Sequence, residues 1–131
     1  MSTFNAIGTA ASGVTVYRKW LDAVSDNIAN MDNVSKTSES AFQARYVVAQ
    51  EAQDGNGAQV GGIAYGSAEG TLSYEPDNPL ADTEGYVRRP DIDLGSQMAQ
   101  LMMAQRAYQA NLSVVDRARD SYNAAIQLGK G

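Results

Sequence analysis

The chain contains no cysteine and no histidine among its 131 residues. Thiolate nucleophiles, imidazole bases and Cys/His zinc sites are therefore excluded, and no disulfide supports the fold. Aromatic residues are few (two Phe, one Trp and seven Tyr), which favours packed helices over a compact globule. No apolar run approaches the ~20 residues of a membrane span, and no basic segment marks a cleaved signal peptide. We expect no membrane span, and export, if any, without signal cleavage.

Basic charge is also scarce in the middle of the chain. Residues 36–93 contain four basic and ten acidic side chains, whereas the two ends together contain six basic and five acidic ones. The overall net charge of −5 argues against a nucleic acid partner, because phosphate binding needs a basic surface. The charge distribution instead predicts a solvated acidic middle and nearly neutral ends that can pack closely.

The N-terminal segment has a continuous heptad pattern over residues 4–31. Its apolar positions alternate by three and four residues: Ile7, Ala10, Val14, Tyr17, Leu21, Val24, Ile28 and Met31. This spacing predicts a helix that packs along one face against another helix. Two glycines weaken the segment by roughly 1 kcal/mol each relative to alanine, so its stability should come from packing.

The C-terminal segment shows the same spacing over residues 94–128. Its predicted seam consists of Leu94, Met98, Leu101, Tyr108, Leu112, Val115, Tyr122 and Ile126, with Gln105 and Arg119 at polar positions. Asp91 or Asp93 can cap the helix start after Pro90. Two long seams at opposite ends of a short chain most simply pack on each other.

The middle of the chain predicts strands. Six of the sixteen residues from Gly55 to Gly70 are glycine, which excludes a helix there. Runs rich in β-formers surround them, at 46–49, 59–60, 63–65 and 71–74. We expect a mainly α protein with a small β segment (α+β). Its long N- and C-terminal helices, 1–35 and 94–131, pack as an antiparallel coiled coil, and 36–93 forms a central Gly-rich antiparallel β-hairpin region, all within one structural domain.

Residues 21–30, Leu-Asp-Ala-Val-Ser-Asp-Asn-Ile-Ala-Asn, form the most informative stretch. Asn27 and Asn30 lie three apart near the end of the first helix. There, asparagine tolerates the left-handed conformation and can bond to the last carbonyl groups. On composition alone, a helix-ending cap is the ordinary explanation.

This stretch resembles the signature of the axial proteins of the bacterial flagellum, which include rod, hook and hook-associated subunits. The match uses Leu21, Asp22, Ser25, Asn27, Ile28, Ala29 and Asn30. In that family the motif lies on the N-terminal helix, and the terminal helices of neighbouring subunits form the inner core of the tube. The resemblance therefore implies that these residues contribute to assembly.

Two further segments are similar to proximal subunits of the basal-body rod. Residues 78–91, Asn-Pro-Leu-Ala-Asp-Thr-Glu-Gly-Tyr-Val-Arg-Arg-Pro-Asp, resemble the stretch before the C-terminal helix of those subunits, with Asp82, Gly85, Tyr86 and Pro90 as candidate assembly residues. Residues 106–111 resemble a motif of that helix, with Tyr108, Gln109 and Asn111 as candidates. Packing explains Tyr108 on the seam equally well.

Acidic clusters offer two other hypotheses. Asp91-Ile92-Asp93 and Asp54-Gly55-Asn56-Gly57 suggest calcium, but neither continues into the spaced ligands of a calcium loop, so capping and turns explain them better. Asp22 and Asp26 could be imagined as an acid/base pair, yet no pocket is predicted that would raise one pKa. The sequence predicts no catalytic residue, metal or cofactor.

The resemblance implies a non-catalytic rod subunit of the flagellar basal body. Such a subunit would assemble with its own copies and with other rod proteins, leave the cell uncleaved through the flagellar type III export apparatus, and transmit torque from motor to hook. Another short rod protein is an alternative, as is a helical-hairpin adaptor or secreted effector that binds one partner. An enzyme has little support.

Overall fold

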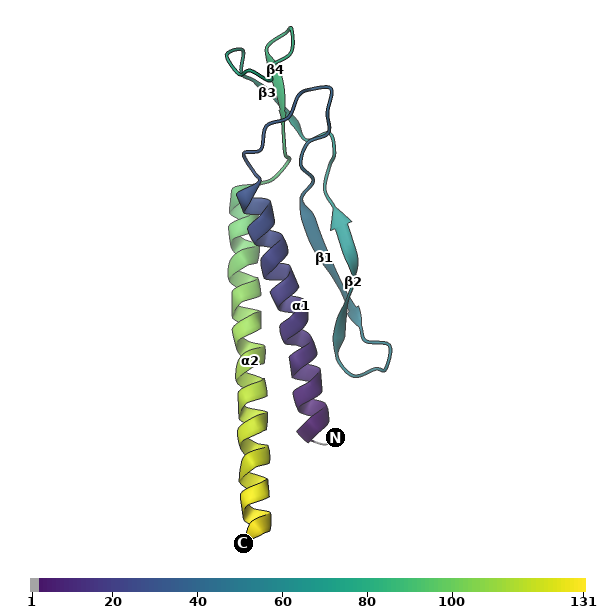
Figure 1. Ribbon diagram of the computed structural model, residues 1–131, viewed down its shortest axis with the longest axis vertical. Coiled ribbons are helices and arrows are strands. Elements are labelled where there is room, and N and C mark those ends of the chain that lie inside the picture. Colours follow the sequence, from purple (N-terminus) through teal and green to yellow (C-terminus); the bar gives the residue numbers. More distant parts are fainter. Residues whose placement is uncertain (1–2) are drawn as a thin grey trace. The chain divides into compact units, whose positions relative to one another are not determined.

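The computed structural model describes residues 3–131. Its elements run α1 (Thr3–Ala29), β1 (Arg45–Glu51), β2 (Ala58–Tyr65), β3 (Thr71–Tyr74), β4 (Tyr86–Arg89) and α2 (Leu94–Lys130), as Figure 1 shows. Two long helices and two small antiparallel sheets confirm the predicted fold class. The described chain divides into two compact units, of which one contains residues 3–21, 47–62 and 102–131 and the other contains 22–46 and 63–101.

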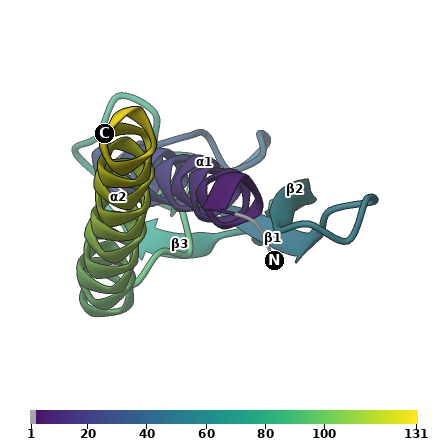
Figure 2. The same cartoon turned by 90° about the horizontal axis from the view of Figure 1, so that it is seen from below.

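In the first unit, α1 lies between α2 and the β1–β2 hairpin (Figures 1 and 2). Val16, Tyr17 and Trp20 of α1 share an apolar hollow with two residues of β1, Val47 and Ala49. On the α2 side the helices approach closely, since a Cβ at Gly13 would lie 2.9 Å from Asn111 Oδ1. Glycine at this position therefore serves the packing of the two helices, which offsets its poor helix propensity.

In the second unit, the end of α1 and the start of α2 pack with the segments that follow α1 and precede α2. The core is small and consists of Ala23, Val24, Ala41, Ala44 and Val87. Across the helices, Asn27 bonds to Gln97. The residue numbers of this pair add to 124, as do those of Gly13 and Asn111, which is the relation expected of antiparallel helices.

The seam predicted on α1 lies at buried or half-buried positions from Ile7 to Ile28. Of the eight apolar positions predicted for the seam on α2, four are exposed in the chain. Leu94, Met98, Leu112 and Ile126 are 37–45% exposed. The positions that alternate with Leu101, Tyr108, Val115 and Tyr122 on the inner face are Gln97, Ala104, Asn111 and Ala118. Small and amide side chains occupy the intrachain contact because the helices approach closely there.

The strands lie in two separate two-stranded sheets, β1–β2 and β3–β4. The predicted run 46–49 lies within β1, the runs 59–60 and 63–65 both lie within β2, and the run 71–74 coincides with β3. Strand β4 was not predicted. It pairs antiparallel with β3 in a register that places Thr71 opposite Arg89 and Tyr74 opposite Tyr86. One further bridge joins Ser35 to Arg88, so the chain after α1 is tied to β4.

The predicted helix start on α2 is confirmed by its cap. Asp93 Oδ2 accepts a hydrogen bond from Ser96 N at 2.9 Å, which satisfies one of the free amides of the first turn. At the end of α1, Asn30 Nδ2 donates to Asp26 O at 2.8 Å, as a capping residue does. Neither Asn27 nor Asn30 adopts the left-handed conformation that asparagine tolerates, since no non-glycine residue within 3–131 has a positive φ.

Candidate assembly interface

The motif at residues 21–30 divides between two faces of α1. Leu21 and Ile28 are half-buried and Asn27 is fully buried, so these three side chains face the chain's own core. The exposed members of the motif are Asp22, Ser25 and Ala29, whereas Asn30 is half-buried at the helix end. The exposed members are therefore the most accessible part of the motif.

Asn27 acts as a clamp inside the chain. Its Oδ1 accepts from Arg45 N at 2.8 Å, and its Nδ2 donates to Arg45 O at 2.9 Å, so the side-chain amide pairs with β1 as a neighbouring strand would. The same Nδ2 donates to Gln97 Oε1 at 3.1 Å. A single buried amide therefore joins α1, the start of β1 and α2. Gln97, only 2% exposed, was missed because a glutamine off the apolar seam gives no sign of burial in the sequence.

The second motif, residues 78–91, folds into the loop before β4 and β4 itself. Asp82 Oδ1 accepts from Glu84 N and Tyr86 N, and its Oδ2 accepts from Thr37 Oγ1 at 3.0 Å. These bonds, with the Tyr86 amide first, lower the pKa of Asp82. Asp82 thus organises the turn that leads into β4.

The glycine and tyrosine of this motif have local packing roles as well. Gly85 has φ +90°, and a Cβ there would lie 2.8 Å from a ring carbon of Tyr74. Tyr86 packs against Tyr74 with ring centroids 5.3 Å apart, and Pro90 is buried. Tyr86 itself remains 37% exposed. The geometry of the motif supports a structural turn, with Asp82 and Tyr86 as the candidate residues that remain exposed to a partner.

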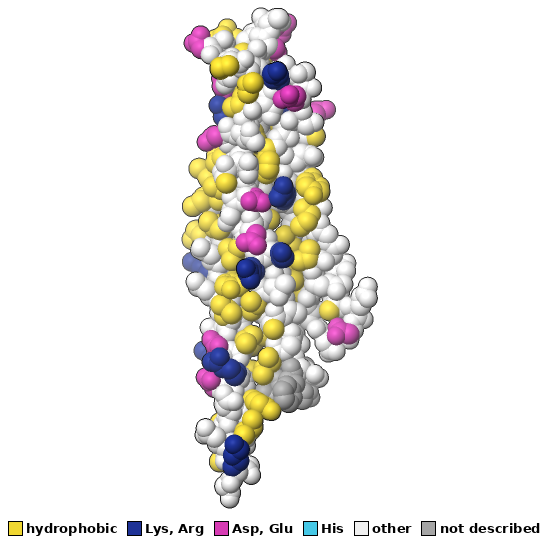
Figure 3. All heavy atoms as spheres, viewed as in Figure 1, with side chains coloured by type: hydrophobic (Ala, Val, Ile, Leu, Met, Phe, Trp, Pro, Cys, Tyr) yellow, Lys and Arg dark blue, Asp and Glu magenta, His cyan; other side chains and the backbone are white. Residues whose placement is uncertain are grey.

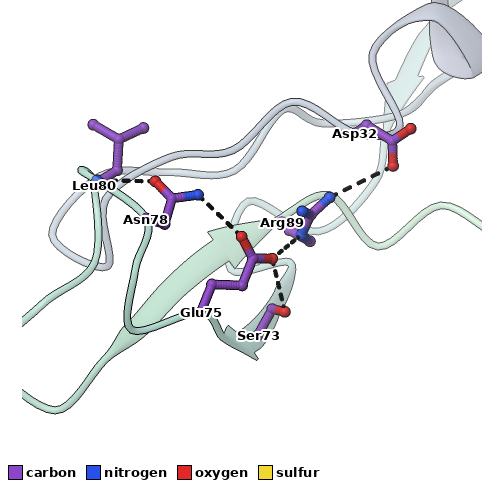
Figure 4. A network of polar contacts seen from close by, with 6 residues as sticks. All are labelled: Asp32, Ser73, Glu75, Asn78, Leu80 and Arg89. Carbon is purple, nitrogen blue, oxygen red and sulfur yellow. Dashed lines mark hydrogen bonds and ion pairs between the residues drawn. The ribbon is translucent and has the colours of Figure 1, made fainter.

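A polar network beside this motif was not predicted (Figure 4). Glu75 Oε1 accepts from Arg89 Nε at 2.6 Å, and Arg89 reaches Asp32 Oδ1 at 3.5 Å. Ser73 and Asn78 also donate to the Glu75 carboxylate, each at 3.0 Å. The Arg89 bond, followed by those of Asn78 and Ser73, lowers the pKa of Glu75 from 4.5 to about 2.

The third motif also divides by face. Tyr108 and Asn111 are half-buried on the intrachain seam, and Asn111 Nδ2 donates to Ala107 O at 2.9 Å. Gln109 is exposed. Of these candidate assembly residues, Gln109 is therefore accessible to another chain, whereas Asn111 faces Gly13 of the same chain.

Two exposed stripes follow from these placements. The outer stripe of α1 alternates by three and four residues and carries mostly small side chains: Gly8, Ala11, Thr15, Arg18, Asp22, Ser25 and Ala29. The flank stripe of α2 has the same periodicity and larger side chains: Met98, Met102, Gln105, Gln109, Leu112, Asp116, Arg119, Asn123 and Ile126. Figure 3 shows hydrophobic side chains along α2 on the visible face. Exposed apolar side chains that lie together, such as those of Met98 and Met102, are typical of surfaces that contact other proteins.

The acidic clusters have structural partners. Asp54 accepts from Asn56 N within a turn, Asp93 caps α2, and Asp26 pairs with Arg45 at 2.9 Å. Within the described residues, no group of three or more potential ligands could hold a metal ion. In the same part of the chain, no helix has both the length and the apolar character of a membrane span.

Comparison with known proteins identifies the chain's relatives. The family described as "Flagellar basal body rod FlgEFG protein C-terminal" matches residues 83–128, which contain β4 and most of α2. The chain is 33% identical to the flagellar basal-body rod protein FlgC of Salmonella typhimurium, over 99% of this chain and all of that protein. It is 34% identical to FlgC of Escherichia coli O157:H7 and 27% identical to FlgC of Bacillus subtilis, again over 99% of this chain and all of each relative.

The alignments with these relatives include the two helices and the β segment between them. The exposed stripes are what a subunit of an assembly requires, and the relatives are rod proteins rather than enzymes. The chain therefore belongs to the flagellar basal-body rod protein family, in its FlgC group, and is a structural subunit of the rod.

Proposed function

We propose that this subunit polymerises through its two terminal helices into the tubular wall of the proximal rod. Its partners there are other copies of itself and other rod proteins, and the resulting drive shaft transmits torque from the motor to the hook. The subunit reaches the rod through the flagellar type III export apparatus without cleavage of a signal peptide, and it works in the periplasmic or cell-wall space.

The observation that carries this proposal is the exposed apolar surface of α2. Met98, Met102 and Leu112 on the flank stripe are 37–52% exposed, and Val114 and Leu128 on other faces are 49% and 83% exposed. A helix that is apolar on several sides is suited to a position enclosed by protein. Contacts with neighbouring subunits on more than one side of α2 would provide that enclosure.

The exposed members of the sequence motifs support the same proposal. Asp22, Ser25 and Ala29 lie on the outer stripe of α1, and Gln109 lies on the flank stripe of α2. These are the motif residues that we propose for contacts between subunits. Asn27, Asp82 and Gly85 instead shape the chain that presents those contacts.

A deletion experiment tests the proposed function. The gene would be deleted in the bacterium that encodes this chain and supplied again on a plasmid, and basal bodies would be examined by electron microscopy. We expect the deletion strain to stop before hook formation, with other protein secretion intact, and the plasmid to restore hooks. Normal hooks in the deletion strain would overturn the proposal. A single-partner adaptor would instead give a small complex of fixed size in sedimentation.

A further inference from the structure

The two exposed stripes have complementary side chains. On the outer stripe of α1, five of the seven positions carry Gly, Ala, Ser or Thr, which leave shallow hollows, and the other two carry Arg18 and Asp22. On the flank stripe of α2, two methionines are followed by two glutamines and a leucine, at positions 98, 102, 105, 109 and 112. Large side chains on one surface can fill the space that small side chains leave on a facing surface, so that the two helices interdigitate.

Within the chain these stripes are both exposed, so they do not pack on each other. We propose that the flank stripe of α2 in one copy packs on the outer stripe of α1 in a second copy of this chain. The inference rests on the proposed function, since it names the surfaces through which the subunit polymerises. Because the two surfaces differ, the contact is heterologous, and such contacts build open helical arrays when they do not close into a ring.

The direction of the contact follows from helical symmetry. The operation that relates neighbouring copies in a tube is a rotation and a shift along one axis, which preserves the direction of every helix that runs along that axis. Since α1 and α2 are antiparallel in each copy, α2 of one copy then runs antiparallel to α1 of the next. In antiparallel packing, the number of a residue on one helix and the number of the residue that faces it on the other helix have a constant sum. Because both stripes repeat every seven residues, the possible registers have sums that differ by seven.

One register fits best, with facing residue numbers that add to 127. It places Met98 on Ala29, Met102 on Ser25 and Leu112 on Thr15, so that large apolar side chains meet small ones. Between them, the amide of Gln105 faces the carboxylate of Asp22, and the amide of Gln109 faces the guanidinium of Arg18. An amide can donate to the carboxylate and accept from the guanidinium, so both charges receive a partner.

The neighbouring registers are poorer. A sum of 134 pairs Arg18 with Asp116, but it places Leu112 against the Asp22 carboxylate and carries Met98 and Met102 beyond the end of α1. Burial of two methionines outweighs one exposed ion pair. A sum of 120 places Ala29 opposite residue 91, which lies before the start of α2. Of these three registers, only 127 keeps the whole outer stripe opposite α2 and places both Met98 and Met102 on small side chains.

Because the chain has no natural cysteine, introduced cysteines are its only thiols, and disulfide crosslinking can test the proposed contact. Two differently tagged full-length chains, one with Ala29→Cys and the other with Met98→Cys, would be produced together in the deletion strain. Each chain then has a single thiol, so a disulfide between the two tags can only be intermolecular. We expect this pair, and a Ser25→Cys with Met102→Cys pair, to crosslink in isolated basal bodies after mild oxidation.

Two control pairs define the geometry. Ala29→Cys with Ala99→Cys tests the adjacent position on another face of α2, and Ala29→Cys with Gln105→Cys tests the 134 register. Crosslinking of either control in preference to the Met98 pair would overturn the inference. So would swimming cells in which neither expected pair crosslinks. If the tagged wild-type chain is absent from the rod, the proposed function itself fails.

A size exchange gives a second test that does not depend on thiol reactivity. Ala29→Met should abolish swimming by overfilling the contact, and Met98→Ala in the same chain should restore it. Ala99→Met, an exposed alanine on another face of α2, should leave swimming unchanged. Normal swimming of the Ala29→Met strain, or no restoration by the second change, would contradict the register.

Discussion

The buried amide of Asn27 offers the sharpest test of how the family motif works. We expect Asn27→Ala to destabilise the isolated chain, although the motif is associated with assembly. The substitution removes the partner of Arg45 N, Arg45 O and Gln97 Oε1, which lie 2.8, 2.9 and 3.1 Å from the Asn27 amide. At roughly 1 kcal/mol for each group left without its partner, the loss is about 3 kcal/mol.

A matched control lies three residues away. Asn30→Ala removes the same side-chain amide from the same motif, but it breaks one exposed bond, from Asn30 Nδ2 to Asp26 O. That loss should stay below about 1 kcal/mol. Urea unfolding at low protein concentration measures both variants, because dilution removes contacts between copies. Hydrogen exchange should in addition show faster exchange of the Arg45 amide in Asn27→Ala alone.

Equally small losses of stability in the two variants would contradict this prediction. So would an Asn27→Ala chain that blocks rod assembly while its urea unfolding and the hydrogen exchange of its Arg45 amide stay unchanged. The second result would mean that the asparagine acts between subunits. The predicted outcome would instead separate the motif into an inward residue that shapes the subunit and outward residues that join subunits.

Three further predictions follow from the local geometry. Because the pKa of Glu75 falls from 4.5 to about 2 on folding, its charged carboxylate stabilises the fold above pH 4.5, and this contribution is lost as the pH falls toward 2. Glu75→Gln should remove that loss of stability in unfolding curves taken between pH 2 and 6. Gly85→Ala should cost about 2 kcal/mol, measured by thermal unfolding, because a Cβ at φ +90° meets an aromatic ring; an unchanged melting temperature would refute the turn geometry. Gly8→Ala should stabilise the isolated chain by about 1 kcal/mol because its Cβ meets open space, whereas Gly13→Ala should gain less because its Cβ meets α2; equal gains would contradict the close helix contact.

The helices could be predicted from the sequence because heptad spacing is a local signal. On α1 the apolar spacing identified the buried face. On α2 it identified a mixture of two faces, since Leu101 and Tyr108 lie on the intrachain seam while Met98 and Leu112 are exposed. Periodicity reports which positions are apolar, and it does not distinguish burial inside the subunit from burial between subunits.

Strand β4 and its network could not be predicted for a different reason. Tyr86-Val87-Arg88-Arg89 is short and half charged, and it becomes a strand because it pairs with β3 and because Val87 is completely buried. The partner of Arg89 is Glu75, fourteen residues earlier in the chain. Such pairing depends on tertiary contacts, which no local pattern records.

The candidate assembly residues were predicted from resemblance, and the structure refines what each can do. Asn27 and Asn111 face the chain's own helices, whereas Asp22, Ser25 and Ala29 are exposed on α1. A motif on one helix can therefore serve folding on one side and assembly on the other, because successive residues of a helix point in different directions.

Electron cryomicroscopy of the basal-body rod tests the central claim most directly. It would be performed on rods from the deletion strain supplied with this chain. We expect α1 and α2 of this chain to stand antiparallel in the rod wall, with Met98 and Met102 of one copy covered by the outer stripe of α1 in the next. A rod without this chain, or one in which the flank stripe of α2 remains exposed to solvent, would contradict it.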